Sequence, residues 1–403
     1  MNKELSSFAA RLREKIFSGS REGHEVGEVK NSPSQPSSSS RNISDKEFSK
    51  LALELFALQF QHNSAYRKIC EARKLTPQII EHWTQIPAVP TSAFKELELT
   101  SLAPAERTAV FHSSGTTEQK PSRHFHCAES LAVYEASLWP WFEQNVLRSA
   151  DGSSASSPAT RGRAVRAPMF LTPPPAQAPH SSLVHMFEVV REKMGAAEKT
   201  FLGQLDANGP WTLDFDAVLA NLGNNRQSAI GNRQFIFGTA FSFVHLLDFL
   251  AEKNLKFTLP PGSRVLETGG YKNRSRTMPK DELHALITER LGVPRENIIC
   301  EYGMSELSSQ AYAGRAALPR SHGRAAARPY HFPPWARVQI ISPETGREVA
   351  EGETGLIRIF DLANVFSVAA IQAEDLGVRR GDGFELLGRA QLAEPRGCSL
   401  MTA

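Results

Sequence analysis

The chain has 403 residues, of which 41% are hydrophobic and 22% charged, and its formal net charge is +3 at pH 7. This composition is typical of an ordinary globular protein, and the length indicates a large domain or two closely packed ones. The small net charge speaks against a nucleic-acid or anionic membrane partner, and no apolar run approaches the roughly 20 residues needed to span a bilayer.

The N-terminal segment is expected to contribute a short helix and a tail. Phe8, Leu12 and Ile16 follow helical spacing, and the charged residues around them do not fit the apolar core of a signal peptide. Residues 18–43 are polar, rich in serine and almost without large apolar groups, so they cannot offset their ordering entropy. We therefore predict a short helix plus a disordered low-complexity tail over residues 1–43.

Folding is expected to begin at Ser44. Ser44 and Glu47 have the spacing of a capping box, in which each side chain satisfies an unpaired backbone amide at a helix start. Apolar residues then follow at helical spacing, at Phe48, Leu51, Leu55 and Leu58.

Strands and helices alternate further along the chain. Residues 235–241 (FIFGTAF) and 264–270 (RVLETGG) have the apolar character of buried strands that end in glycine-containing loops. Residues 242–254 between them predict a helix. Residues 279–292 predict a second amphipathic helix, because proline stands in its first turn and glycine at its end.

Two more strands are predicted at 337–342 and 355–362, on either side of a turn-rich segment. Segments 151–163 and 314–329 are irregular in composition and are predicted to be flexible insertions. The alternation of strands and helices predicts an α/β core with active-site loops at the strand ends.

The segment 111–124 (FHSSGTTEQKPSRH) packs four hydroxyl residues around Gly115, with Lys120 close behind. Hydroxyls and backbone amides around a glycine can bind an anion, and a lysine adds positive charge. The phosphate-loop pattern of NTPases does not fit, because no second glycine precedes a lysine. A serine- and threonine-rich turn without a ligand is the alternative, so the interpretation depends on other motifs.

Two downstream motifs supply the groups that a nucleotide site needs. Residues 301–310 (EYGMSELSSQ) hold a tyrosine that can stack on a purine and a carboxylate that can hold Mg²⁺. Asp375 precedes residues 383–389 (GFELLGR). An aspartate can accept from both ribose hydroxyls, and an arginine can donate to the sugar or to a phosphate.

In their order and intervals these motifs resemble the acyl-adenylate-forming enzymes. Within that superfamily the chain is similar to the acyl-protein synthetase (LuxE) family of bacterial luminescence, from about Ser44 to the C-terminus. The similar stretches are 86–96 (IPAVPTSAFKE), 179–186 (PHSSLVHM), 237–248 (FGTAFSFVHLLD), 267–276 (ETGGYKNRSR), 301–310 (EYGMSELSSQ) and 396–400 (RGCSL). The resemblance implies an adenylation domain over 44–389, of mixed sheets with flanking helices, lacking most of the usual small C-terminal domain.

The resemblance implies a nucleotide site that holds ATP and Mg²⁺. The residues expected to hold the β- and γ-phosphates are Ser113, Ser114, Gly115, Thr116, Thr117 and Lys120. The residues expected along adenine and the α-phosphate are Gly269, Gly270, Tyr302, Gly303 and Ser305. Glu306 is the expected magnesium ligand, Asp375 the ribose ligand, and Arg389 the arginine after the hinge strand.

The resemblance also implies an acyl pocket and an acyl acceptor. The acyl pocket near the carboxylate is expected to be lined by Phe237, Gly238, Thr239 and Phe241. Cys398, in the flexible tail 390–403, matches the cysteine that carries the acyl thioester in the luminescence synthetases. A neighbouring arginine can lower the pKa of this thiol, and Gly397 gives the tail freedom to move.

Three features of the chain have simpler interpretations. The four cysteines are far apart and none is in a C-x-x-C pair, which argues against zinc and disulfides and favours a reducing cytoplasm. Packing or loop roles, rather than catalytic ones, are expected for His112, His126 and His245. Because Leu307 stands where a nucleophile elbow needs glycine, a serine hydrolase is not favoured.

Common acyl-CoA ligases continue beyond the GR motif into a small domain that carries a lysine used in adenylation, whereas this sequence ends soon after it. Three cations remain candidates for the role of that lysine: Lys120, Lys272 and Arg276. The expected catalytic residues are Lys120, Glu306 and Cys398.

The main hypothesis is ATP-dependent, AMP-forming activation of a fatty or other hydrophobic carboxylic acid, with transfer to Cys398 as a thioester. Transfer to coenzyme A or a carrier protein is a second hypothesis, and a non-catalytic acyl- or nucleotide-binding module is a third. A fatty-acid reductase or an acyl carrier stays open as a partner.

Overall fold

The computed structural model describes residues 2–21, 43–113, 120–148, 166–205, 211–223, 233–270, 276–314 and 328–389. The predicted insertion at 151–163 and the tail 390–403 with Cys398 lie outside these residues, as do most of the segments 18–43 and 314–329. None of the helices in the described ranges is both long and apolar enough to cross a membrane.

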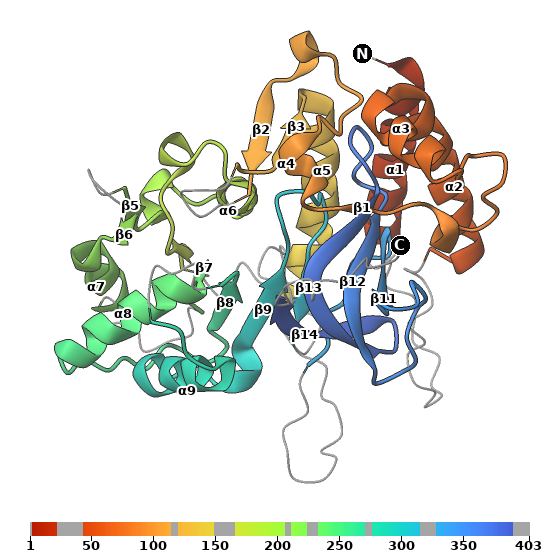
Figure 1. The fold of residues 1–403 in the computed structure, drawn as a ribbon. Coiled ribbons are helices and arrows are strands. Elements are labelled where there is room, and N and C mark those ends of the chain that lie inside the picture. The colour runs from red at the N-terminus through yellow and green to blue at the C-terminus, as the bar shows by residue number, and fades with distance from the viewer. Residues whose placement is uncertain are drawn as a thin grey trace, which may run out of the picture.

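A layer of helices forms one side of the molecule (Figure 1). Its members are α1 (Lys3–Arg21), α2 (Asp45–His62), α3 (Ser64–Ala72), α4 (Ala93–Glu96) and α5 (Ala128–Phe142). Helix α2 begins as predicted, because the Ser44 hydroxyl accepts a hydrogen bond from the Glu47 amide at 3.2 Å. Small two-stranded sheets lie apart from the main ones, formed by β2 (Ala109–His112), β3 (Arg123–His126), β5 (Gly203–Gln204) and β6 (Thr212–Leu213).

Helix α1 forms where the sequence predicts it, but it belongs to the core. Phe8, Leu12 and Ile16 are all buried, in the same cluster as apolar residues of α2 and of the C-terminal sheet. The helix packs against α5 and α2, and the Ser6 hydroxyl donates to the Glu129 carboxylate at 2.8 Å. The folded part of the chain therefore begins before Ser44, which corrects the expectation from sequence.

Five strands form a mostly parallel sheet in the spatial order β10–β9–β8–β7–β4. They are β4 (Met169–Phe170), β7 (Phe235–Thr239), β8 (Arg264–Thr268), β9 (Ile298–Tyr302) and β10 (Ala311–Ala313). Only β10 runs antiparallel to its neighbour within this sheet. The strands predicted at 235–241 and 264–270 are confirmed as β7 and β8.

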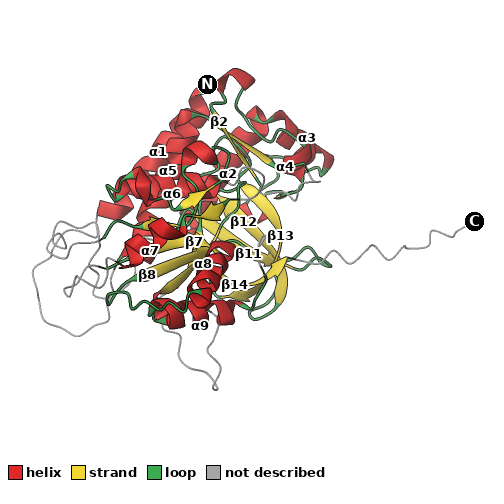
Figure 2. Ribbon diagram, turned by 90° about the vertical axis from the view of Figure 1, so that its left-hand side faces the viewer, coloured by secondary structure: helices red, strands yellow, loops and turns green. Residues whose placement is uncertain are grey.

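Helices cover both faces of this sheet (Figure 2). They are α6 (Ser182–Lys193), α7 (Phe215–Gly223), α8 (Ala240–Glu252) and α9 (Lys280–Leu291). Alternate strand residues point to opposite faces. Ile236 and Val265 pack with α8 and α9, whereas Phe237 and Leu266 pack with α5 and α6. The two helices predicted from sequence are confirmed as α8 and α9, and Gly292 ends α9 in a left-handed conformation, with φ 66°.

A second sheet lies beside the first (Figure 1). It contains β1 (Val89–Pro90), β11 (Ala336–Ile341), β12 (Thr354–Asp361), β13 (Ala370–Arg380) and β14 (Gly383–Arg389). Strand β13 pairs with β1, β12 and β14, and its pairing with β14 sets Asp375 opposite Arg389. The two strands predicted at 337–342 and 355–362 are confirmed as β11 and β12.

The position of α1 in the core gives a stability prediction. The Phe8→Ala variant removes a ring that is only 1% exposed, so we expect it to lower the free energy of unfolding by about 3–5 kcal/mol. Urea unfolding of the full chain measures the change. Phe17 lies on the same helix but is 45% exposed, so Phe17→Ala is the matched control and should cost less than about 0.5 kcal/mol. Equal losses for the two variants would contradict the assignment of α1 to the core.

Candidate active site

The hairpin of β2 and β3 positions the base of the hydroxyl-rich segment. The Ser122 amide donates to the Ser113 hydroxyl at 2.9 Å, and the Ser113 amide donates to the Ser122 carbonyl at 3.4 Å. These two bonds close the base of the segment between the strands. The predicted phosphate-binding residues 114–117 lie outside the described residues.

The same hairpin reaches the segment that carries Glu306. The Ser122 and Ser305 hydroxyls lie 3.4 Å apart, and the Ser305 hydroxyl donates to the Glu306 carboxylate at 3.0 Å. The His124 ring nitrogen Nδ1 lies 2.8 Å from the Ser305 carbonyl. Two motifs that are almost 200 positions apart in the sequence therefore meet through a continuous run of polar contacts.

Glu306 is a buried carboxylate at the end of this run. Burial raises its pKa, while the hydroxyls of Ser122 and Ser305 and the positive charge of Arg389 oppose that rise. A buried carboxylate is costly unless a cation or several donors balance it. Oxygen ligands of this type suit Mg²⁺, so the local chemistry fits the predicted metal ligand.

Tyr302 and Asp375 join the two sheets. The Tyr302 hydroxyl donates to the Asp375 carboxylate at 2.9 Å, and Arg389 Nε lies 4.0 Å from the other Asp375 oxygen. Burial raises the pKa of Asp375, while the bond from Tyr302 and the charge of Arg389 oppose that rise. The Arg389 side chain is 84% exposed, so its guanidinium is open to solvent and to a ligand. Three of the predicted nucleotide-binding residues are thus brought together.

Gly269 and Gly270 follow β8 next to this group. Gly269 has φ +65°, which favours glycine, and nothing described lies within 4 Å of a Cβ built on either residue. At the end of β8, none of the described residues therefore covers the backbone of these two glycines. By contrast, Gly303 is crowded, because a Cβ there would lie 2.4 Å from the Glu301 carboxylate oxygen Oε1.

A buried clamp that the sequence did not reveal holds the Glu306 segment. The Asp361 carboxylate at the end of β12 accepts from the Ser308 amide at 2.9 Å and from the Ser309 hydroxyl at 2.7 Å. The Asn364 side chain donates to the Glu306 carbonyl at 2.8 Å. The signal for this clamp in the sequence was an aspartate at the end of an apolar strand, with an asparagine three residues later.

The candidate cations lie in less direct positions. Lys120 Nζ is 3.5 Å from the Glu96 carboxylate, and both side chains are largely exposed. Arg276 binds the Asp248 carboxylate of α8 at 2.9 Å, and Lys272 lies outside the described residues. The described contacts therefore do not select one substitute for the lysine of the small domain.

Three of the four residues predicted to line the acyl pocket have clear packing or capping partners. The Phe237 ring is fully buried and packs against Phe142 and Phe170, with centroids 5.6 and 5.4 Å away. The Thr239 hydroxyl caps α8, and Phe241 packs against Trp211, with centroids 4.5 Å apart. Phe237 is accordingly a core residue on the α5 and α6 face of the sheet.

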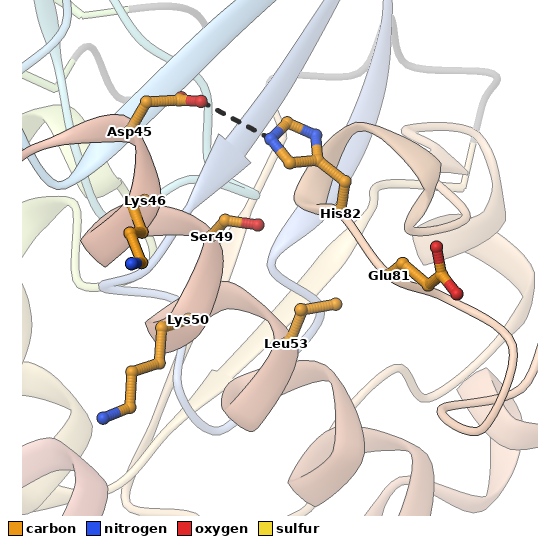
Figure 3. A pocket seen from close by; sticks show the side chains of 7 residues that line it. All are labelled: Asp45, Lys46, Ser49, Lys50, Leu53, Glu81 and His82. Carbon is orange, nitrogen blue, oxygen red and sulfur yellow. Dashed lines mark ion pairs between the residues drawn. The ribbon is translucent and has the colours of Figure 1, made fainter.

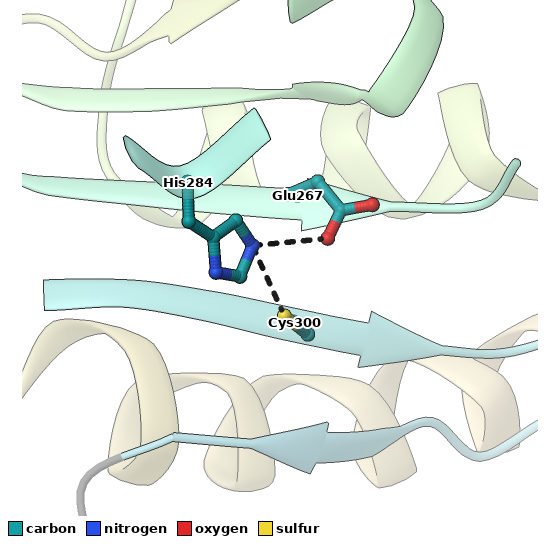
Figure 4. A group of neighbouring side chains, drawn as sticks. All are labelled: Glu267, His284 and Cys300. Atoms are coloured by element: carbon teal, nitrogen blue, oxygen red, sulfur yellow. Dashed lines mark hydrogen bonds and ion pairs between the residues drawn. The ribbon is translucent and has the colours of Figure 1, made fainter. Parts of the chain in front are cut away.

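Glu267, His284 and Cys300 form the one cluster of possible metal ligands in the described part of the chain (Figure 4). His284 Nε2 lies 3.6 Å from the Glu267 carboxylate and 3.7 Å from the Cys300 thiol. Burial raises the pKa of the Cys300 thiol to about 12, so a metal would have to displace its proton. Lys280 Nζ lies 4.0 Å from Glu267 and supplies a positive charge, so these contacts join α9 to β8 and β9.

A surface hollow of about 580 Å³ lies between the start of α2 and the segment after α3 (Figure 3). It is lined by Asp45, Lys46, Ser49, Lys50, Leu53, Glu81 and His82. None of the residues predicted to bind nucleotide or acid lines this hollow, and its one ion pair, between His82 and Asp45, is exposed. It is separate from the site around Glu306.

Sequence comparison relates the chain to known ligases. The family model for acyl-protein synthetase, LuxE, matches residues 25–123 and 196–403. Two relatives named long-chain-fatty-acid–luciferin-component ligase, from Vibrio harveyi and Aliivibrio fischeri, are each 22% identical to this chain. The alignments cover 87% and 88% of this chain and 86% and 87% of the relatives.

Solved structures show the same fold. A 2-hydroxyisobutyryl-CoA ligase in an open conformation, in complex with 2-HIB-AMP and CoA, superposes with a TM-score of 0.59 and 13% identity. The superposition covers 90% of this chain and 81% of that one. The fold is therefore that of the acyl-adenylate-forming ligases, and the matched residues show that the chain belongs to the acyl-protein synthetase (LuxE) family of ligases.

Proposed function

We propose that this chain uses ATP to activate a fatty or other hydrophobic carboxylic acid as an acyl-adenylate and transfers the acyl group to Cys398. One observation carries the proposal: polar contacts link the base of the hydroxyl-rich segment to Glu306, beside the Tyr302–Asp375 pair. These are the groups needed along a nucleoside triphosphate. The names of the two ligase relatives support a fatty acid as substrate.

The first step makes a carboxylate into an electrophile. A carboxylate oxygen attacks the α-phosphorus of ATP, the bond to pyrophosphate breaks, and an acyl-adenylate forms. The protein contributes positioning and charge neutralisation. Asp375 would accept from the ribose hydroxyls, the open backbone at Gly269 and Gly270 would border adenine, and the hydroxyl segment after Ser113 would donate to the phosphates.

Glu306 is the residue proposed to hold magnesium. Its carboxylate is buried and accepts a hydrogen bond from the Ser305 hydroxyl. Its backbone carbonyl accepts a hydrogen bond from the Asn364 side chain, which belongs to the buried clamp. Bound Mg²⁺ would neutralise charge on the triphosphate. The clamp would keep the carboxylate in place when the nucleotide enters.

The second step transfers the acyl group to a thiol. The Cys398 thiolate attacks the acyl carbonyl, AMP leaves, and the thiol proton passes to solvent. The other three cysteines are buried, and burial raises the pKa of Cys70 to about 11 and of Cys300 to about 12. Buried thiols of this kind are poor nucleophiles, which favours the tail cysteine. A reducing cytoplasm would keep that thiol available.

Replacing the proposed magnesium ligand tests the first step. We expect Glu306→Gln to reduce acid-dependent exchange of pyrophosphate into ATP by about 100-fold or more, because a neutral amide cannot balance the metal charge. The stabilisation of the protein by ATP, measured as a thermal shift, should also lose its dependence on Mg²⁺.

Glu344→Gln, in an exposed turn, is the control and should behave like the wild type. Unchanged exchange in Glu306→Gln, with unchanged magnesium dependence, would remove Glu306 from the proposed role.

Replacing the tail cysteine separates the two steps. We expect Cys398→Ala to abolish the acyl adduct in an intact-protein mass measurement while pyrophosphate exchange continues, because exchange needs only the adenylate. Ser399→Ala keeps the thiol and serves as the control.

An adduct that persists in Cys398→Ala would exclude this cysteine as the acceptor. Wild-type protein that exchanges pyrophosphate, forms no adduct and acylates coenzyme A would instead favour a ligase with a soluble acceptor.

A further inference from the structure

Three polar residues lie at the end, or one residue before the end, of neighbouring parallel strands on one face of the first sheet. Thr239 is paired in register with Thr268, and Thr268 with Glu301. Two residues earlier, the same face of each strand carries an apolar side chain of the aromatic core around α5 and α6. The polar residues therefore form the layer between that core and the loop that carries Glu306.

Glu301 is the charged member of this layer. Its side chain is buried, its Oε2 atom accepts from the Thr268 hydroxyl, and its Oε1 atom lies where a Cβ at Gly303 would clash. Burial raises the pKa of Glu301 to about 7, and only the bond from Thr268 opposes that rise. Within the described part of the chain, no positively charged side chain contributes to its titration. Among the described residues, Glu301 thus has a hydroxyl donor but no cation, although a buried carboxylate is costly unless a charge or several donors balance it.

Two buried tyrosines, Tyr312 and Tyr134, interact electrostatically with this carboxylate. Tyr312 lies opposite Glu301 in the pairing of β10 with β9, is only 2% exposed, and interacts electrostatically with both Glu301 and Tyr134. The Tyr312 hydroxyl has no hydrogen-bond partner among the described residues. The Tyr134 hydroxyl on α5 accepts from the Gln310 side chain at 3.1 Å and donates to the Ser182 carbonyl at 3.4 Å.

Two buried histidines extend the group beyond Tyr134. The His185 and Tyr134 rings lie 5.3 Å apart, and the His126 ring lies 6.5 Å from Tyr134. Burial lowers the pKa of both histidines, which therefore stay neutral near pH 7. Nε2 of each ring is buried and finds no hydrogen-bond partner within the described ranges. The Tyr312 hydroxyl and two buried ring nitrogens thus have no hydrogen-bond partner among the described residues.

We propose that Glu301 and Tyr312 form a polar subsite for a hydrogen-bond-donating substituent, a hydroxyl or an amine, on the carboxylic acid that this chain activates. Native proteins leave few buried polar atoms unpaired, and such atoms are expected where a ligand completes them. Glu301 Oε1 borders Gly303, in the loop that leads to Ser305 and Glu306. A substituent close to the reacting carboxyl group would reach it.

A purely aliphatic acid fits this subsite poorly. Its methylene groups would take the place of water around Glu301 and the Tyr312 hydroxyl without offering a donor or an acceptor. Sites built to hydrogen-bond a substrate group reject analogues that lack the group much more strongly than apolar pockets reject an added methylene. The inference rests on the proposed activation of a carboxylic acid, and it narrows the class of that acid.

Matched acids test the subsite through pyrophosphate exchange. The substrates are decanoate and its 2-hydroxy, 3-hydroxy, 2-amino and 3-amino derivatives, each assayed with the full chain, ATP and Mg²⁺. We expect at least one substituted acid to have a kcat/KM about 10-fold or more above that of decanoate. We expect Glu301→Leu to lower this ratio by about 10-fold or more, because leucine cannot accept a hydrogen bond.

Two variants control for charge and for folding. Glu301→Gln keeps an acceptor oxygen, so it should retain a preference for the hydroxy acid and lose any preference for the amino acid. Glu344→Leu, in an exposed turn, should leave all ratios unchanged. Melting temperatures of the variants identify any that do not fold.

The outcomes separate this proposal from the activation chemistry. A wild-type preference for decanoate that Glu301→Leu leaves unchanged would overturn the subsite while the ligase proposal stands. A second outcome is that none of the acids supports pyrophosphate exchange, while a labelled hydroxy acid still binds in equilibrium dialysis and this binding depends on Glu301. That outcome would overturn the ligase proposal and keep the subsite. Neither exchange nor Glu301-dependent binding would overturn both.

Discussion

The site depends on one set of contacts, which connects the hydroxyls of Ser122 and Ser305 to the Glu306 carboxylate. The β2–β3 hairpin and the loop after β9 belong to separate sheets, and these hydroxyls join them, together with the contact between His124 and the Ser305 carbonyl. Because the residues are buried, breaking the run would leave unpaired polar groups in a dry environment, which costs about 1–3 kcal/mol for each group. The contacts therefore fix the distance between the predicted phosphate-binding segment and the predicted metal ligand.

The second sheet supplies the other half of the site. Strand β13 brings Asp375 against the Tyr302 hydroxyl, and β12 ends in Asp361, which holds the backbone of the Glu306 segment. The first sheet thus presents the loop, while the second presents the groups that orient it. Displacing one sheet against the other would break both connections at once, so the packing of the sheets and the geometry of the site are one property.

Local signals in the sequence predicted the elements that bury one clear face. Helices α2, α8 and α9 have helical apolar spacing with capping residues at their ends, and β7 and β8 are short apolar runs. Strands β13 and β14 carry charged residues and were not predicted as strands, because their pairing is set by neighbours far along the chain. The core position of α1 likewise depends on contacts with α5 and α2 that spacing within one helix does not reveal.

The site shows the same division. The motif residues Tyr302, Glu306, Asp375 and Arg389 could be named from sequence because their order along the chain is characteristic, but their partners could not. The structure adds a charge problem: Glu301, Glu306, Asp361 and Asp375 are all carboxyl groups whose pKa burial raises. A triphosphate entering this region would be repelled unless cations came with it. Asp361 is satisfied by backbone and hydroxyl donors, and Arg389 acts on Asp375 and Glu306. With the proposed Mg²⁺ at Glu306, Glu301 is the one of these four carboxyl groups whose described contacts include neither a cation nor more than one donor, and we propose that the acid supplies the missing partner.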